Sequence, residues 1–367
     1  MFAQRLKTFA LKLKEYKLDG FIITNPVNIF YLCDFRGVSP TEREAILIFA
    51  AGPTLVTARL YQNEAQLLAS GDLKVKIIDE RNQIFEYIKK IFRVGLPTEA
   101  LAKVGFEEQN LTVAELSELK KTLPKAKFVP TKNLVEDLRV IKSDDEISRI
   151  EKAQIISQKA FGQLLKTLKT GQTETEIADR LAKIIKDLGG QGLAFESIVA
   201  TGPNSAKPHH VTGHRRLTMN DTLLIDFGAK YQNYSADIAR TIFIGKPKTE
   251  QENIYRLVKK AQKETIKSIT HGIKASDAYY KAHTVFKNQK VHNYFLHGLG
   301  HGIGLEVHER PYLRSTINDQ LLEGMIFSVE PGLYFPSWGG VRIEDLVTIK
   351  NGKAKVLGKL SEEIIVI

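Results

Sequence analysis

The sequence has little cysteine and no long apolar run. Its 367 residues include a single cysteine, Cys33, which excludes an internal disulfide and a cysteine metal cage. No hydrophobic stretch approaches the ~18 residues of a membrane-spanning helix, so no membrane partner is expected. Lysines interrupt the opening segment MFAQRLKTFALKLKEY, and no small-residue cleavage site follows it, so it does not read as a secretory signal. We therefore expect a cytoplasmic location.

Acidic residues are in deficit, with 42 Asp and Glu against 53 Lys and Arg, for a formal net charge of +11. Such an excess can attract polyanions. The lysines are scattered, however, and they are paired with glutamates on helical patterns such as RLVKKAQKE. No basic stretch is interleaved with aromatic residues in the way typical of RNA-binding sequences. We interpret the charge as a solvated surface and expect no nucleic-acid partner.

The first third of the chain alternates helix and strand patterns. The apolar runs AILIFA and TLVTA flank a Gly-Pro turn, which predicts a hairpin. This region has no nucleotide fingerprint and no acids clustered with histidines, so we expect it to shape the substrate site or pair subunits. Capping-box patterns at Ser143 and Thr173 then predict two helices. We expect an α/β (α+β) protein, with a small α/β domain over residues 1–130 and a catalytic domain over residues 131–367.

Acidic residues interrupt the apolar strand patterns of the last half. They lie in TLLIDFGAKY, YSADIARTIFIG, MIFSVEPGLYF and GVRIEDLVTI, as Asp226, Asp237, Glu330 and Glu344. One such acid is explained more simply by a salt bridge or a strand-end cap. Four converging acids would repel one another by several kcal/mol unless cations meet them. Oxygen-rich ligation with an imidazole suits Mn²⁺, Co²⁺, Fe²⁺ or Zn²⁺, so the pattern predicts a pair of divalent cations.

The segment HGLGHGIGLEVHER is the natural source of the imidazole. His297 and His301 stand four residues apart, as in a zinc helix, but Gly298 occupies the position that H-E-x-x-H needs for glutamate. Each glycine in the segment would cost a helix about 1 kcal/mol. The alternating glycines also miss the G-x-G-x-x-G spacing of a nucleotide loop. We therefore predict a loop or irregular strand that delivers His301 to the four acids.

Several segments together resemble the proline-specific "pita-bread" metallopeptidases, Xaa-Pro aminopeptidase (aminopeptidase P) and Xaa-Pro dipeptidase (prolidase). They are IKSDDEI, IVATGPNSAKPHH, LLIDFGAKYQNYSADIART, HGLGHGIGLEVHE and VEPGLYFPSWGGVRIED. NPVNIFYLCDF resembles the small first domain of the same family, so the resemblance covers nearly the whole chain. It implies a pita-bread catalytic domain, two divalent metal ions per subunit (manganese, with cobalt or zinc as alternatives), proline-containing peptide substrates and a homodimer.

The resemblance also implies a role for each matching residue. Asp237 and Glu344 would bridge the two ions, and Glu330 would also act as the general base. The implied metal ligands are Asp226, Asp237, His301, Glu330 and Glu344. The implied catalytic residues are Glu330, His209 and His308, and the implied substrate-binding residues are His209, His297, His308 and Arg342. Because His210 follows His209 directly, a slip in register would let either imidazole serve.

The expected reaction is hydrolysis of the N-terminal Xaa-Pro bond of peptides by a hydroxide that bridges two divalent cations. Some prolidases carry an arginine where this chain has Tyr312, and neither Arg310 nor Arg314 matches that position. We therefore favour an aminopeptidase, with Xaa-Pro dipeptidase as the alternative. Two related classes fit this chain less well. Methionine aminopeptidase normally lacks the first domain, and creatinase-like relatives lack the complete metal set. A non-catalytic binding protein on the same fold is the remaining alternative.

Overall fold

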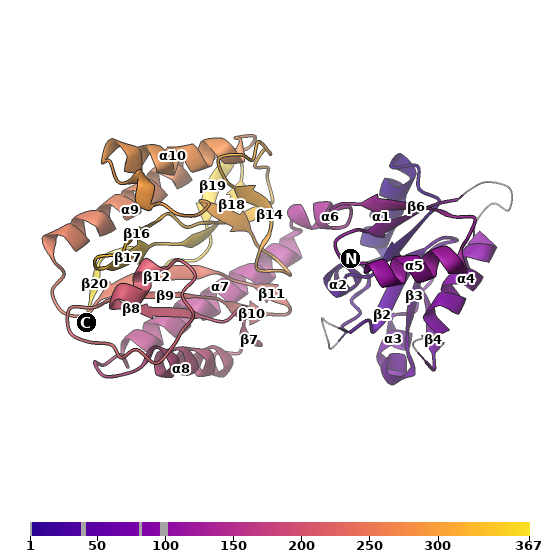
Figure 1. Cartoon of the computed structure of the whole chain (residues 1–367), viewed down its shortest axis with the longest axis horizontal. Helices are drawn as coiled ribbons and strands as arrows, with labels where there is room; N and C mark the ends of the chain where they lie inside the picture. Colours follow the sequence, from indigo (N-terminus) through magenta and orange to yellow (C-terminus); the bar gives the residue numbers. More distant parts are fainter. Residues whose placement is uncertain (1, 38–41, 81–82, 96–101) are drawn as a thin grey trace. The chain divides into compact units, whose positions relative to one another are not determined.

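The computed structural model describes residues 2–37, 42–80, 83–95 and 102–367. The chain divides into two compact units, Met1–Arg139 and Val140–Ile367 (Figure 1). The boundary expected after Pro130 would cut strand β6 (Lys127–Thr131), which pairs along its whole length with β5 (Lys103–Glu107) of the first unit. The division therefore lies later, inside helix α6 (Glu136–Val140). Within the described ranges, no helix is long and apolar enough to cross a membrane.

The first unit is built on a six-stranded mixed sheet of order β4-β3-β2-β1-β5-β6. The predicted hairpin is confirmed, because β2 and β3 pair antiparallel across the Gly-Pro turn. Strands β1, β5 and β6 are parallel, as are β3 and β4. The other four strands of this sheet are β1 (Gly20–Ile23), β2 (Ala45–Phe49), β3 (Pro53–Ala58) and β4 (Lys74–Ile78).

Helices accompany this sheet, and their apolar residues supply much of its core. Leu6, Phe9 and Leu13 of the first helix recur at helical spacing and are buried. A hydrophobic cluster joins the apolar face of the helix that follows β4 to the buried isoleucines of β1 and β2. The helices are α1 (Phe2–Glu15), α2 (Pro26–Cys33), the 3₁₀ turn η1 (Arg59–Tyr61), α3 (Gln62–Leu68), α4 (Gln83–Gly95) and α5 (Val113–Thr122).

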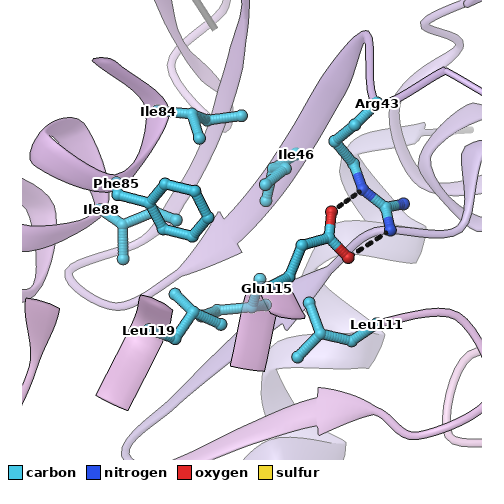
Figure 2. A pocket seen from close by; sticks show the side chains of 9 residues that line it. Arg43, Ile46, Ile84, Phe85, Ile88, Leu111, Glu115 and Leu119 are labelled. Atoms are coloured by element: carbon cyan, nitrogen blue, oxygen red, sulfur yellow. Dashed lines mark hydrogen bonds and ion pairs between the residues drawn. The ribbon is translucent and has the colours of Figure 1, made fainter. Parts of the chain in front are cut away.

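A small cavity of about 180 Å³ lies between this sheet and helices α4 and α5 (Figure 2). Isoleucine and leucine side chains and Phe85 line most of it, and Arg43 and Glu115 close one side. All five N–H donors of Arg43 are bonded, to Glu115, Asn110 and the carbonyl oxygen of Thr24. The ion pair therefore has a structural role. Among the described residues that line this cavity, no polar side chain is left free for catalysis.

The second unit contains four sheets. A four-stranded sheet has the order β20-β12-β9-β8, and a five-stranded sheet has the order β14-β13-β15-β18-β19. Strands β11-β10-β7 and β16-β17 form two smaller sheets. The strands are β7 (Gly192–Leu193), β8 (Ile198–Thr201), β9 (Thr222–Phe227), β10 (Ala229–Tyr231), β11 (Tyr234–Ser235), β12 (Ile238–Phe243), β13 (Gly300–Gly302), β14 (Glu309–Leu313), β15 (Ile326–Val329), β16 (Gly332–Phe335), β17 (Gly339–Arg342), β18 (Asp345–Lys350), β19 (Lys353–Val356) and β20 (Ile365–Val366).

Two pairs of helices cover the sheets of this unit from opposite sides (Figure 1). Helices α7 (Asp144–Leu165) and α8 (Glu174–Asp187) share a core with β9 and β12. Helices α9 (Thr249–Ser268) and α10 (Ala275–Asn288) share a core with β15 and β18. Both predicted capping boxes are confirmed, at the N-termini of α7 and α8. The 3₁₀ turns of this unit are η2 (Gly202–Ala206) and η3 (His292–Tyr294).

Candidate metal centre and active site

One cavity of the second unit, of about 520 Å³, collects every site residue expected from the sequence. Its lining combines acids, imidazoles and a guanidinium with a few apolar side chains, among them Phe195, Ile198 and Val307. The expected residues that line it are His209, Asp226, Asp237, His297, His301, His308, Glu330, Arg342 and Glu344. These residues are far apart in the sequence, so the fold of the unit brings them together.

The five expected ligands lie within strands or directly beside them, on strands that border this cavity. Asp226 lies in β9 and Asp237 directly precedes β12, its antiparallel partner. His301 is the middle residue of β13, Glu330 follows β15, and Glu344 lies between β17 and β18. A carboxylate at a buried strand end is costly unless it is paired or coordinates a metal, so their convergence needs a compensating charge.

The glycines around His301 let neighbouring backbones approach closely. An added Cβ at Gly300 would lie 2.0 Å from the carbonyl oxygen of Ser328, and one at Gly302 would lie 2.2 Å from that of Arg310. No other residue type fits such contacts without moving the backbone. The segment contains the short strand β13 (Gly300–Gly302) and no helix, as its glycine pattern predicted.

His301 points one ring nitrogen at the acids. Its Nε2 lies 3.6 Å from Asp237 Oδ2 and 3.4 Å from Glu330 Oε1. Its Nδ1–H donates to the carbonyl oxygen of Gly302 at 3.2 Å, a tautomer that leaves Nε2 with a lone pair for a metal ion. Ligand atoms of His301, Asp237 and Glu344 all lie within 4.8 Å of one another. Asp226, in contrast, is bound through Oδ2 by Arg342 Nη1.

The donor set fits a divalent cation. Asp226 Oδ1, Asp237 Oδ1 and both carboxylate oxygens of Glu344 are buried and have no hydrogen-bond partner among the described residues. Burial, together with the neighbouring carboxylates, raises the pKa of Asp237 and Glu344 well above their usual range. Burial raises the pKa of Glu330 to about 7. The site disfavours the charge of these unpaired carboxylate oxygens, and a bound cation would neutralise it.

His297 is fully hydrogen-bonded to the protein. Its Nδ1–H donates to the carbonyl oxygen of Gly298 at 2.7 Å, and its Nε2 accepts from the hydroxyl of Tyr334 at 2.7 Å. That hydroxyl in turn accepts from Arg342 Nε at 2.7 Å. Burial, and then the charge of Arg342, lowers the pKa of His297 to about 3, so the ring is neutral. His297 can therefore offer a substrate its ring surface but no free nitrogen.

The structure separates the two adjacent histidines. His209 lines the cavity, whereas His210 Nε2 binds Glu174 Oε2 at 2.8 Å outside it. His308 also lines the cavity, with its ring centre 4.2 Å from that of His301. Burial, and then the neighbouring His301, lowers the pKa of His308, so this imidazole is neutral near pH 7.

Sequence reasoning assigned no role to two residues here, Tyr334 and Arg314. Tyr334 is buried and links Arg342 to His297. Arg314 lines the cavity beside Tyr312. Their signals were weak, because Tyr334 looks like any strand aromatic and Arg314 follows the end of β14. Side chains alternate along a strand, so residues 312 and 314 lie on one face. This alternation could have pointed to Arg314.

The family follows from comparison with known proteins. The model of metallopeptidase family M24 matches residues 148–351. The chain belongs to metallopeptidase family M24. The Creatinase/Prolidase N-terminal domain matches residues 5–141. The predictions of the family, of the fold class and of a metallo-exopeptidase are confirmed, and the family implies divalent metal ions and peptide substrates.

Relatives of this M24 chain match it over its whole length. The Xaa-Pro dipeptidase of Pyrococcus furiosus is 33% identical over 362 residues, which are 99% of each chain. The structure of an Xaa-Pro dipeptidase from Bacillus anthracis superposes with a TM-score of 0.93 at 31% identity and covers 100% of both chains. The X-Pro aminopeptidase of Thermotoga maritima gives a TM-score of 0.88 at 29% identity, with 99% of both chains covered.

Proposed function

We propose that this metallopeptidase is an Xaa-Pro dipeptidase, which hydrolyses the bond before proline in dipeptides. The sequence favoured an aminopeptidase, because position 312 holds tyrosine and not arginine. Relatives named as Xaa-Pro dipeptidases support the other reading. The observation that carries the proposal is Arg314, a cation placed in the cavity two residues beyond Tyr312.

Arg314 is available to a substrate, whereas Arg342 is not. The guanidinium of Arg342 is bonded to Asp226, to Tyr334 and to the carbonyl oxygen of Pro208. For Arg314, the described ranges contain no hydrogen bond or ion pair to the guanidinium, which lies 5.4 Å from the ring centre of Tyr312. An arginine fork matches the two oxygens of a carboxylate.

Gly298 makes room for the stem of Arg314. A Cβ at this glycine would lie 3.0 Å from Arg314 Cγ and 3.4 Å from Nε. Arg314 is also close enough to the expected ligand His301 for its charge to lower the pKa of that imidazole, after the larger effect of burial. A dipeptide whose scissile bond lies at the metal centre would therefore have a cation near its terminal carboxylate.

The residues proposed to hold two divalent cations are Asp226, Asp237, His301, Glu330 and Glu344. Cations bound there would supply Lewis acidity at the peptide carbonyl and lower the pKa of the attacking water. Glu330, which lines the same cavity, would accept the proton of that water. The imidazoles of His308 and His209 line the same cavity and can donate hydrogen bonds to the carbonyl oxygen as it gains charge.

Replacing Arg314 by methionine tests the choice of substrate. The change keeps most of the apolar stem and removes the charge. Because a charge-assisted hydrogen bond contributes about 1.5–3 kcal/mol, we expect kcat/KM for Ala-Pro to fall about tenfold to hundredfold. Hydrolysis of Ala-prolinamide, which lacks the carboxylate, should change little. Steady-state kinetics on the two substrates measures the ratio.

Arg310→Met is the matched control, since Arg310 pairs with Asp319 on the same stretch of chain and does not line the cavity. It should leave both substrates unaffected. Equal losses on dipeptide and amide in Arg314→Met would refute a role in carboxylate binding. If the unsubstituted enzyme cleaves Ala-Pro-Gly faster than Ala-Pro, the aminopeptidase reading is right instead.

Two finer expectations belong to the same proposal. Manganese is the proposed metal, with cobalt or zinc as alternatives that use the same ligands. Metal analysis of the purified protein, followed by reconstitution with each ion, distinguishes them. A homodimer is the proposed assembly, and analytical ultracentrifugation measures it directly.

A further inference from the structure

Glu174 is a fully buried carboxylate that does not line the metal-centre cavity. Its Oε1 accepts from the backbone nitrogen of Thr201 at 2.8 Å, from the hydroxyl of Thr201 at 3.0 Å and from Asn204 Nδ2 at 2.9 Å. Its Oε2 accepts from His210 Nε2 at 2.8 Å and from the backbone nitrogen of Gly213 at 3.0 Å. Five donors on one buried carboxylate form a rigid hub.

The cap of helix α8 does not require this hub. Thr173 is the N-cap residue, and its hydroxyl accepts from the backbone nitrogen of Glu176 at 3.1 Å. The side chain of Glu176 bonds back to the nitrogen of Thr173 at 2.8 Å and so completes the capping box. The Glu174 side chain is free to bind another part of the chain, and all of its partners lie in residues 201–213.

The bonded segment carries His209 between two anchors. It begins at the end of β8, passes through η2 and then has no regular secondary structure around His209. On one side of His209, the carbonyl oxygen of Pro208 accepts from Arg342 Nη2 at 2.8 Å. On the other side, His210 is held by Glu174. The chain is thus fixed at both neighbours of His209, and the imidazole between them faces the cavity.

We infer that Glu174 and His210 are positioning residues, which hold the segment 208–210 so that His209, and not its neighbour, faces the substrate. The inference rests on the proposed function, in which His209 contacts the substrate. Misplacing a reacting or contacting group by about 1 Å can cost a hundredfold in rate, so such a hub has a measurable consequence.

His210→Ala, His210→Gln, His209→Ala and the double variant His209→Ala/His210→Ala form the test. We expect His210→Ala to lower kcat/KM about tenfold to hundredfold. His210→Gln keeps an N–H donor of similar reach to Glu174 and should recover most of the activity. In the His209→Ala background, His210→Ala should cause no further loss, because its effect passes through His209. A purely structural role would instead make the two losses multiply.

Crystal structures provide a readout that does not depend on hydrolysis. The His209 imidazole should leave its position in His210→Ala and keep it in His210→Gln. His271→Ala is the matched control, since His271 Nδ1 accepts from the backbone nitrogen of Glu323 and does not line the cavity. An unmoved His209 in His210→Ala overturns the inference. A normal rate in His209→Ala would instead contradict the proposed role of His209, and the crystal structures would still decide the positioning.

Discussion

Asp237→Ala should lower kcat/KM for Xaa-Pro substrates on the order of a thousandfold, and chelation of the unsubstituted enzyme should do the same. Ligand atoms of Asp237, His301 and Glu344 all lie within 4.8 Å of one another, so Asp237 belongs to the cluster proposed to hold metal. Loss of a metal ion removes several kcal/mol of transition-state charge stabilisation, and each 1.4 kcal/mol is a factor of ten. Steady-state kinetics and metal analysis on the same samples check the result.

Asp187→Ala is the control for this substitution. Asp187 forms an exposed ion pair with Lys183 near the end of α8, so its loss should change neither activity nor metal content. Added Mn²⁺ should restore the chelated enzyme but not Asp237→Ala. Full activity in the metal-free protein would show that the metal mechanism is wrong.

The sequence was most informative where a residue type would destabilise the helix or strand in which it is expected to lie. The alternating glycines from Gly298 to Gly304 could not belong to a helix, and the structure has strand β13 there. Four acids in apolar strand patterns pointed to a charged cavity for the same reason, and all four line one cavity. The resemblance to a family then supplied roles that these costs alone could not.

The sequence could not supply contacts that depend on the folded chain. Glu174 looked like an ordinary residue in the first turn of a helix, yet its partners begin at Thr201. Arg314 was set aside because position 312 is the one matched by the family, whereas the cavity is reached from both positions. A sequence does not record which way each imidazole faces, and in the structure His209 lines the cavity while His210 binds Glu174.

The metal-free protein should lose stability as the pH rises above about 6.5. Burial and mutual repulsion raise the pKa of Asp237 and Glu344, and burial raises that of Glu330 to about 7. The folded state therefore keeps protons that the unfolded chain has already lost. Each such proton lowers the free energy of unfolding by about 1.4 kcal/mol per pH unit.

The histidines oppose this trend only at lower pH. Burial lowers the pKa of His297, His301 and His308 from the ordinary value of 6.5, so below that pH the unfolded chain binds more imidazole protons than the folded one. Their effect makes stability rise with pH and then ends near 6.5. Above that pH the carboxylates act alone, and the net slope becomes negative.

Thermal unfolding of chelated protein between pH 6.5 and 8.5 measures this slope. Glu330→Gln removes the acid whose pKa burial raises to about 7, so its metal-free form should lose less stability over the same range. Burial also raises the pKa of Glu107, in the first unit, to about 7, but that contribution is common to both proteins and cancels in the comparison. Saturating Mn²⁺ should abolish the decline, because cations replace the protons. A flat or rising melting temperature in the chelated protein would mean that the carboxylates are already ionised there, and that another positive charge holds them.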